Sequence, residues 1–338
     1  MRPRPAEAAP TPADATVVVC AYTLDRWDDL VSGVRGSVDQ GVGRVVVVID
    51  HNDDLLTRAR EALAGRSEGG TLVEVVPNLR VQGASGARNT AIDMVEGGVV
   101  VFLDDDATPQ PGWIEALLEP YADPAVAAVG GAADPRWPVA RPPQLVGELN
   151  WIVGCTYTGQ PETRTDVRNL WGCNMSVRAS VLDEVGGFDE QVGRIGLIPL
   201  GGEETELCIR IHQRVAGARV VYEPRARVDH RVTPARTTWA YLRSRSMAEG
   251  LSKAAMAAQV GADDATSVER DYVRRVLTAA VRREVAAGLR GDRNGWRGAA
   301  GVVTALAVTG AGYVRGRVGL SGSADREAAA RRAPSGRA

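Results

Sequence analysis

The stretch Val100-Val101-Phe102-Leu103-Asp104-Asp105-Asp106 places three carboxylates directly after four apolar residues. The apolar residues predict a buried strand, which the following Ala-Thr-Pro at 107–109 would end. Alternate side chains of a strand point to the same side, so we expect Asp104 and Asp106 to lie close together. Carboxylates at that spacing repel each other unless a hard cation such as Mg²⁺ or Mn²⁺ binds them. The stretch therefore indicates a metal site that also takes substrate phosphates, with a solvated turn or a helix N-cap as the alternative.

Composition limits the classes of protein to which the chain can belong. With 338 residues, the chain is long enough to bury a substantial core. Because its formal net charge is −2, we expect no nucleic-acid partner. Its four cysteines show no C-x-x-C spacing, which indicates reduced thiols in a cytosol and no structural zinc. Residues 1–15 are rich in proline and alanine and match neither a signal peptide nor a membrane anchor.

Apolar runs alternate with amphipathic segments through residues 16–103. Strands are predicted at 16–21, 45–49, 72–76 and 99–103, and helices at 27–38, 54–63 and 85–95. This alternation predicts an α/β fold with a mostly parallel central sheet and helices on both faces. Ligands of such sheets bind at the carboxyl ends of the strands, where Asp50 and the acidic residues 104–106 would lie.

The turn after the first predicted strand, Cys20-Ala21-Tyr22-Thr23-Leu24-Asp25, contains no glycine. Dinucleotide-binding folds carry G-x-G-x-x-G at this turn, and P-loops carry G-x-x-x-x-G-K-[ST]. NAD-dependent and Walker-type enzymes are therefore disfavoured. A sugar-nucleotide pyrophosphorylase shares the strand pattern, but it would also need a Gly-rich loop at this position.

A series of short motifs runs through residues 16–253 in a single order. The motifs are Val-Val-Val-Cys-Ala-Tyr at 17–22, Val-Val-Val-Ile-Asp at 46–50, Asn78, Gly-Ala-Arg-Asn at 86–89, Phe-Leu-Asp-Asp-Asp at 102–106, Trp-Gly-Cys-Asn-Met-Ser-Val-Arg at 171–178, Val-Gly-Gly-Phe-Asp-Glu at 185–190, Gly-Glu-Glu-Thr-Glu-Leu at 202–207 and His230. In these motifs the chain resembles the family-2 glycosyltransferases, which have the GT-A fold. The resemblance implies a nucleotide-sugar transferase domain at 16–235. We expect a helical C-terminal extension at 236–318 and disordered tails at 1–15 and 319–338.

The resemblance implies that the nucleotide-sugar donor contacts residues at the ends of the first strands. Asp50 would accept a hydrogen bond from a nucleobase imide, unless it caps the helix predicted at 54–63. Arg88 would offer a cation near the base or the diphosphate, and a surface salt bridge is the alternative. Ala21 and Tyr22 would hold the nucleoside through backbone and ring contacts.

The acidic triplet resembles the D-x-D motif of the family, which binds Mn²⁺ or Mg²⁺. By this resemblance Asp106 is the direct metal ligand, and Asp104 contacts the ribose or the metal through water. Asp105 would contact the donor sugar or support the loop. His230 matches a late histidine that completes such a site, although a histidine between charged residues is also commonly exposed.

The motif Gly-Glu-Glu-Thr-Glu-Leu at 202–207 lies where the family usually has Glu-Asp followed by a helix. Glu204 matches the aspartate that takes the proton of the acceptor hydroxyl, and Glu203 is the second candidate because glutamate is one methylene longer. An acidic first helical turn that only complements the helix dipole is the alternative. Trp171, Gly172 and Asn174 match the segment that lines the donor sugar and the acceptor, although Trp171 suits a buried core equally well.

The C-terminal region combines basic and apolar residues. Residues 298–314 contain no charge and are flanked by Arg293, Arg297, Arg315 and Arg317. Seventeen residues with four glycines predict an interfacial or buried helix more readily than a membrane span. The basic flanks would suit the inner face of an anionic membrane. In the basic stretch 231–253, arginines could hold an acceptor or donor phosphate or form an amphipathic helix.

Together these features predict a metal-dependent, inverting glycosyltransferase that uses a nucleoside diphosphate sugar, with UDP-sugar preferred on the strength of Asp50 and Arg88. The resemblance suggests a hydroxyl acceptor on a lipid-linked glycan or a small metabolite. The enzyme would be cytoplasmic or peripheral at the cytoplasmic face of the membrane. A non-catalytic nucleotide-sugar-binding protein and a sugar-nucleotide pyrophosphorylase are the alternatives.

Overall fold

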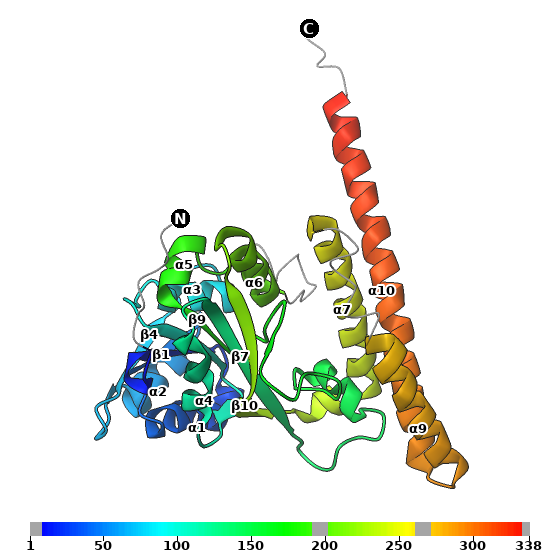
Figure 1. Ribbon diagram of the computed structural model, residues 1–338, viewed down its shortest axis with the longest axis horizontal. Helices are drawn as coiled ribbons and strands as arrows, with labels where there is room; N and C mark the ends of the chain where they lie inside the picture. The colour runs from blue at the N-terminus through cyan, green and yellow to red at the C-terminus, as the bar shows by residue number, and fades with distance from the viewer. Residues whose placement is uncertain (1–8, 191–201, 261–271, 333–338) are drawn as a thin grey trace.

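The computed structural model describes residues 9–190, 202–260 and 272–332 (Figure 1). A ten-stranded sheet has the strand order β3-β4-β2-β1-β5-β9-β7-β10-β6, with β8 paired to β10 off this path. Four parallel strands form its first half: β1 Ala15–Ala21, β2 Arg44–Ile49, β4 Leu72–Pro77 and β5 Val99–Asp104. All four strands predicted from the apolar runs are confirmed, each one residue longer than expected.

The second half of the sheet is mixed. The strand β9 (Asn174–Arg178) runs antiparallel to both β5 and β7 (Val126–Arg136), and β10 (Arg219–Arg231) runs parallel to β7. The short strand β6 (Ala107–Pro109) pairs antiparallel with the end of β10. Two further short strands are β3 (Gly65–Arg66) beside β4 and β8 (Thr165–Asp166) beside β10.

Alternate residues of the central strands supply two separate cores. On one face, Val17 and Val101 pack in an apolar cluster with α1 (Trp27–Asp39), α2 (Asp53–Leu63) and α4 (Trp113–Leu118). On the other face, Val18 and Phe102 pack with α3 (Ala84–Ile92), α5 (Ala179–Val185) and α6 (Glu203–Arg214). Figure 1 shows these helices on opposite sides of the sheet, which confirms the predicted α/β architecture.

The C-terminal region adds long helices beside the sheet. These are α7 (Trp239–Val260), α9 (Thr278–Leu289) and α10 (Arg293–Arg332), with a π-helical segment at Tyr272–Leu277 before α9. Short 3-10 segments lie at Pro12–Asp14, Leu24–Arg26, Glu119–Ala122, Gly147–Val153 and Pro234–Thr237. A third apolar cluster, including Leu149, Leu242 and Val302, joins these helices to the 147–153 segment. Among the described residues, no helix combines the length and apolarity needed to cross a membrane.

Both predicted tails need correction. Residues 12–14 form a 3-10 turn and β1 begins at Ala15, while residues 1–8 lie outside the described part. At the other end, α10 continues to Arg332, well into the segment 319–338 that we expected to be disordered. The run of alanine, arginine and glutamate after Asp325 has high helix propensity, which explains the continuation.

Candidate active site

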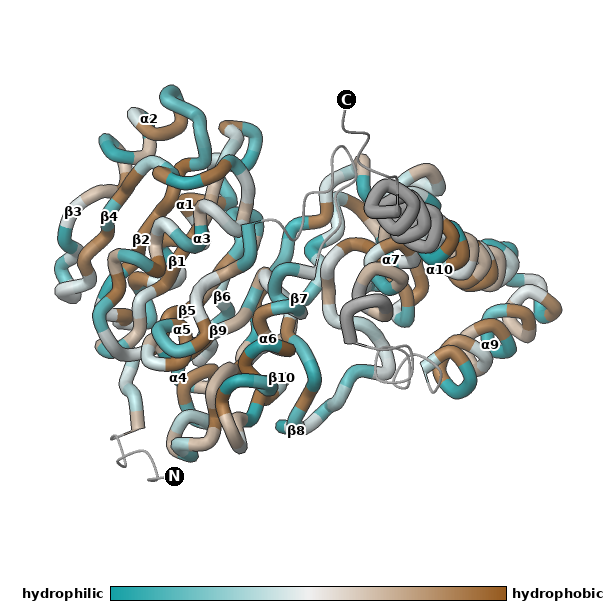
Figure 2. Tube along the Cα trace, turned by 90° about the horizontal axis from the view of Figure 1, so that it is seen from above, coloured by the Kyte–Doolittle hydropathy of each residue, from teal (hydrophilic) through white to brown (hydrophobic). Residues whose placement is uncertain are grey.

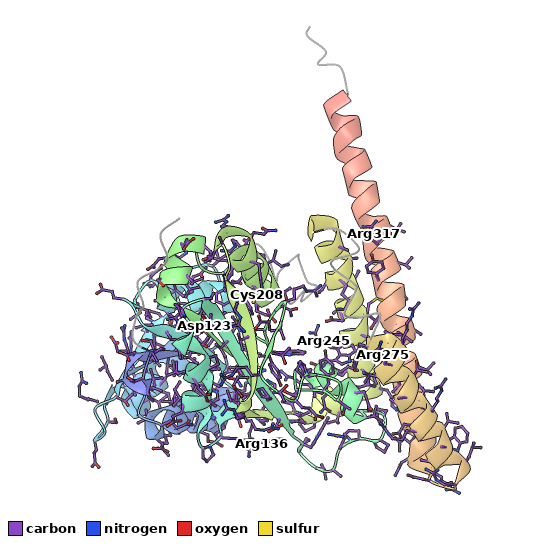
Figure 3. The ribbon with its side chains drawn as sticks, in the orientation of Figure 1. Asp123, Arg136, Cys208, Arg245, Arg275 and Arg317 are labelled. Atoms are coloured by element: carbon purple, nitrogen blue, oxygen red, sulfur yellow. The ribbon has the colours of Figure 1, made fainter. Side chains whose placement is uncertain are left out.

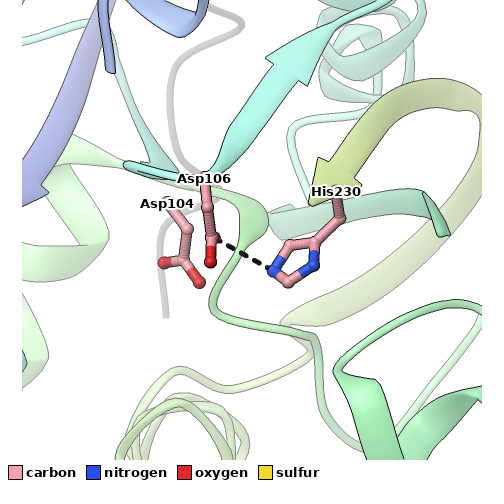
Figure 4. Close-up of side chains that lie close together, drawn as sticks. All are labelled: Asp104, Asp106 and His230. Carbon is pink, nitrogen blue, oxygen red and sulfur yellow. Dashed lines mark ion pairs between the residues drawn. The ribbon is translucent and has the colours of Figure 1, made fainter. Parts of the chain in front are cut away.

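Asp104, Asp106 and His230, here called the Asp–His cluster, converge at the carboxyl edge of the sheet. Each offers one ligand atom, and these atoms all lie within 4.8 Å of one another. Figure 4 shows the two carboxylates and the imidazole pointing into the same space. Oδ1 of Asp106 lies 3.2 Å from Nε2 of His230. The expectation that Asp104 and Asp106 share one side is confirmed.

Backbone pairing explains why residues so far apart in sequence meet. The strand β6 begins directly after Asp106, and its first residue, Ala107, pairs with His230 in β10. Gly33 of α1 makes room for this strand, because a Cβ there would lie 2.7 Å from the carbonyl oxygen of Ala107. The close approach of α1 thus helps to hold the end of the acidic triplet against β10.

His230 is buried, with 3% of its surface exposed, so the alternative of an exposed histidine is wrong. Burial alone would lower the pKa of His230, but the Asp106 carboxylate and Cys155 outweigh it and raise the pKa to about 10. Burial likewise opposes ionisation of Asp106, yet His230 and the nearby arginines lower the pKa of Asp106 to about 2. The Sγ atom of Cys155 lies 3.7 Å from Nδ1 of His230, on the ring edge away from Asp106.

Two arginines complete the surroundings of the cluster. Arg26 donates a 2.6 Å hydrogen bond to Oδ1 of Asp105, and its Nη1 lies 3.3 Å from Oδ2 of Asp106. Arg236 approaches the same Asp106 oxygen at 3.6 Å. Burial raises the pKa of Asp105 to about 7 although Arg26 opposes the shift. Asp105 is therefore tied to Arg26.

The residues of the Asp–His cluster suit a small divalent cation. Two carboxylates and an imidazole are oxygen and nitrogen ligands of the kind that Mn²⁺ and Mg²⁺ accept. Oδ2 of Asp106 is buried and has no hydrogen-bond partner among the described residues, so it keeps an oxygen lone pair for a ligand. Asp104, by contrast, has a side chain 39% exposed and can face substrate or water.

Arg88 connects the Asp–His cluster to the start of α6. Its Nη1 donates to Oε1 of Glu203 at 3.0 Å, and its Nη2 lies 3.5 Å from Oδ1 of Asp104. The guanidinium also lies over the ring of Phe188, 5.0 Å from the centroid. Arg88 is only 6% exposed, so the surface salt bridge considered as an alternative is wrong. Gly172 allows this position, since a Cβ there would lie 2.8 Å from Nη2 of Arg88.

Glu204 follows Glu203 in the first turn of α6 and has a different environment. Its Oε2 atom is buried without a hydrogen-bond partner in the described ranges. Burial raises the pKa of Glu204 to about 8, and the charge of Glu203 adds to the shift. A carboxylate with these properties can take a proton near neutral pH, whereas Glu203 is held by Arg88. An acidic turn that only complements the helix dipole would not need this burial.

Asp50 lies at the end of β2 and is nearly buried. Its Oδ1 accepts hydrogen bonds from Nδ2 of Asn78 at 2.7 Å, and its Oδ2 accepts from the backbone N–H of Gly83 at 2.9 Å. The alternative that Asp50 caps the following helix is wrong, because the N-cap of α2 is Asn52, whose Oδ1 accepts from the N–H of Leu55. Nδ1 of His51 also lies 2.8 Å from Oδ1 of Asp50. Asp50 therefore braces the segment between β4 and α3, and its Oδ2 retains a free lone pair.

Known proteins similar to the chain identify its family. The family model for glycosyl transferase family 2 matches residues 16–186. The chain belongs to this family. A glucosyl-dolichyl phosphate glucuronosyltransferase from Haloferax volcanii is 35% identical over 246 residues, covering 71% of the chain and 76% of the relative. A pre-mycofactocin glycosyltransferase from Mycobacterium tuberculosis is 31% identical over 236 residues, covering 68% of the chain but only 44% of the relative.

A solved structure shares the fold of this family-2 glycosyltransferase. It is the mannosyltransferase PcManGT from Pyrobaculum calidifontis in complex with GDP-Man and Mn²⁺, with a TM-score of 0.51 and 18% identity over 90% of each chain. The family assignment and this shared fold confirm the enzyme class and the GT-A fold. They give no support to the alternatives of a pyrophosphorylase or a non-catalytic binder.

Three residues predicted to line the sugar and acceptor of this family-2 enzyme have different environments. Asn174 is fully buried, accepts a 2.8 Å hydrogen bond from Nε1 of Trp113 and donates to the carbonyl oxygens of Ala132 and Ala226. These core hydrogen bonds occupy the side-chain amide that was predicted to contact a sugar hydroxyl. Trp171 is half-buried with its ring edge against Tyr157, and Gly172 packs against Arg88.

The two residues after Cys20 that were predicted to hold the nucleoside, Ala21 and Tyr22, differ in exposure. Tyr22 is 55% exposed, and the guanidinium of Arg26 lies 5.5 Å from its ring centroid. Ala21 is buried, and its carbonyl oxygen accepts from the N–H of Asp50. These contacts leave the exposed ring of Tyr22 as the surface available to a ligand.

Sequence reasoning missed Arg26 and Cys155 and gave Arg236 only a general phosphate role. Arg26 follows β1 by five positions, at the same sheet edge as the acidic triplet, which is a signal that could have identified it. Cys155 and Arg236 offer no such local signal, because each reaches the Asp–His cluster from a separate segment of the chain.

Proposed function

We propose that the enzyme transfers a hexose from a nucleoside diphosphate sugar, with UDP-sugar preferred, to a hydroxyl group with inversion at the anomeric carbon. The observation that carries the proposal is the Asp–His cluster, linked through Arg88 to the carboxylates of Glu203 and Glu204. A metal site and a proton acceptor on the same sheet edge are the two parts that a single displacement requires.

Asp106, His230 and Asp104 would hold Mn²⁺ or Mg²⁺. When bound, the cation neutralises the charge that develops on the leaving nucleoside diphosphate. To offer Nε2 as a ligand, His230 must first lose the proton that Asp106 stabilises there. Arg26 is held by Asp105, whereas Arg236 meets Asp106 only at 3.6 Å, so we propose that the guanidinium of Arg236 turns toward phosphate oxygens of the donor.

Glu204 is the proposed general base, which takes the proton of the acceptor hydroxyl as its oxygen attacks the anomeric carbon. Its raised pKa places it near the pH range in which a carboxylate is both ionised and basic. We propose that Glu203 does not act as base, because Arg88 holds it. We propose that Arg88 orients Asp104 and Glu203, and that Asp104 would meet the donor diphosphate through the cation.

Asp50, Ala21 and Tyr22 are the proposed nucleoside contacts, with Asp50 accepting from a base imide through a free lone pair. The similarity to a glucosyl-dolichyl phosphate glucuronosyltransferase supports a lipid-linked acceptor, and the similarity to a pre-mycofactocin glycosyltransferase supports a small metabolite. Trp171 and Gly172 stay proposed neighbours of the sugar. We propose a cytoplasmic enzyme that reaches lipid-linked acceptors at the cytoplasmic face of the membrane.

A nucleotide-release assay tests the proposal. The enzyme is incubated with Mn²⁺ and a panel of nucleotide sugars, and free UDP or GDP is measured. Glu204→Gln should lower turnover by at least about 100-fold while donor affinity is unchanged, because the amide cannot accept the proton. Glu115→Gln, an exposed glutamate on α4, is the matched control. Near-normal turnover of Glu204→Gln would contradict the assignment, and NMR of the product anomer decides between inversion and retention.

A further inference from the structure

The helix α10 buries its small residues and exposes its larger apolar ones. On the inner face, a Cβ at Gly301 would lie 2.1 Å from the carbonyl oxygen of Gln144, and one at Gly312 would lie 2.5 Å from that of Met247 in α7. Four larger apolar residues are between 43% and 62% exposed: Trp296, Val303, Leu306 and Val314. The indole of Trp296 also packs against Gly288 of α9. These residues recur at helical spacing and form one continuous apolar stripe.

Basic residues border this stripe at both ends. Arg293 and Arg297 lie at its beginning and Arg315 at its end, and all three are exposed. We call the four apolar residues and these three arginines the outer face of α10. Residues 272–318 contain nine arginines and only two acidic residues, although the whole chain has a net charge of −2. Figure 3 shows Arg275 and Arg317 on the C-terminal helices, away from Asp123 and Cys208.

We propose that the outer face of α10 docks on the surface of an anionic lipid bilayer. An apolar stripe exposed on one side of a helix suits a lipid surface, and arginines at its ends match anionic headgroups. The opposite face of α10 packs on α7 and α9, so the helix would lie along the bilayer surface. Seen from above, α9 and α10 lie at the edge of the molecule opposite β3 and β4, where a flat surface can reach them (Figure 2).

A second copy of the chain and a nucleic acid both fit the outer face of α10 less well than a bilayer does. A second copy of the chain would bring one set of arginines against another, whether the two helices ran parallel or antiparallel. A nucleic acid would pair with the arginines but leave the apolar stripe in water. A bilayer surface satisfies both parts of the face.

The helix that carries the outer face of α10 is also connected to the active site through α7. Arg236, which lies 3.6 Å from Asp106, belongs to the short segment that leads directly into α7. Because α7 packs along α10, docking would hold the Asp–His cluster at a fixed distance from the membrane. The inference deepens the proposed function by naming the surface that presents a lipid-linked acceptor. Lipid binding can still be measured without transfer.

Vesicle flotation of the full chain tests the inference. Vesicles of phosphatidylcholine, with and without phosphatidylglycerol, are mixed with the protein at low and high salt. We expect flotation with the anionic vesicles that weakens as salt rises. The double variant Val303→Glu/Leu306→Glu should lower the partition coefficient by at least about tenfold, and Arg293→Glu/Arg297→Glu by about tenfold. Val139→Glu and Arg35→Glu, exposed positions far from α10 in sequence, are the matched controls.

Nucleotide release with a water-soluble acceptor is measured on the same preparations. Retained release shows that the α10 variants are folded, and it separates failure of docking from failure of the proposed function. The inference is overturned if the wild type does not float with anionic vesicles at low salt, or if the α10 variants float as well as the controls. A dimer in light scattering that Val303→Glu dissociates would also overturn it, since the stripe would then join two copies.

Discussion

The backbone N–H of Arg231 donates a 2.8 Å hydrogen bond to the carbonyl oxygen of Asp106. This bond continues the pairing of β6 with β10 by one residue, so main-chain contacts lock the Asp106 side chain beside His230. Main-chain pairing fixes the position of Asp106 more firmly than a side-chain contact alone would. A slip of one residue in the register would reverse the side on which each side chain points. The enzyme therefore holds its proposed metal ligands in place before substrate arrives.

We expect substitutions of Asp106 and of its neighbour Asp105 to affect metal binding differently. Asp106→Asn should weaken Mn²⁺ binding by at least about tenfold, because it removes a buried anionic ligand. Asp105→Asn is the matched control and should change the affinity by less than about threefold, since Asp105 pairs with Arg26. Electron paramagnetic resonance of free Mn²⁺ gives both affinities. Equal losses in the two variants would place the metal elsewhere.

The raised pKa of Glu204 predicts the pH dependence of turnover. The carboxyl group must be ionised to act as base, so kcat should rise with pH and level off above about 8. Glu203→Gln removes a neighbouring negative charge and frees the guanidinium of Arg88, and both changes lower the pKa of Glu204. The midpoint of the kcat profile should therefore move to lower pH in this variant. An unchanged midpoint would show that another group controls the profile.

The same shift has a consequence for stability. The folded-state pKa of Glu204 lies above the ordinary glutamate value of 4.5, so the folded state binds a proton that the unfolded state releases. The stabilising contribution is fully present below that ordinary value and is lost as pH rises through about 8. Urea denaturation should show that Glu204→Gln loses less stability than the wild type between these pH values. Parallel losses in the two proteins would contradict the burial argument.

We expect substitution of Arg88 to lower the free energy of unfolding by more than substitution of a surface arginine does. Arg88→Met leaves Glu203 and Asp104 beside an apolar side chain, and we expect a loss of about 3 kcal/mol in the free energy of unfolding. Arg80→Met is the control, because Arg80 pairs with Asp93 at the surface and should cost less than about 1 kcal/mol. Urea denaturation measures both. Similar small losses would mean that Arg88 is dispensable for the fold.

We expect substitution of Asn174 to lower the stability of the fold without weakening donor binding. Asn174→Ala leaves the indole N–H of Trp113 and the carbonyl groups of Ala132 and Ala226 unpaired in the core, at a cost of about 3 kcal/mol. At a temperature where the variant stays folded, its KM for the nucleotide sugar should match that of the wild type. A selective rise in this KM would restore Asn174 to the substrate site.

Parts of the site follow from local patterns in the sequence. The apolar runs located four parallel strands to within one residue, and the end of β5 located the acidic triplet. The environments of individual side chains did not follow in the same way. Asp50 and Arg88 both have partners that the motifs do not reveal, such as Gly83 for the first and Glu203 for the second. These partners lie on segments whose positions depend on the whole fold.

The sequence alone determined the four parallel strands of the sheet, the acids at their carboxyl edge and the family that the motifs resemble. It could do so because strand alternation and chain order are local properties. Only the tertiary structure decided that His230 is buried against Asp106, that Asn174 belongs to the core and that α10 turns its larger apolar residues outward. The physical reason is that burial and pairing arise from contacts between distant segments, and these contacts set the charge, the pKa and the accessibility of each group.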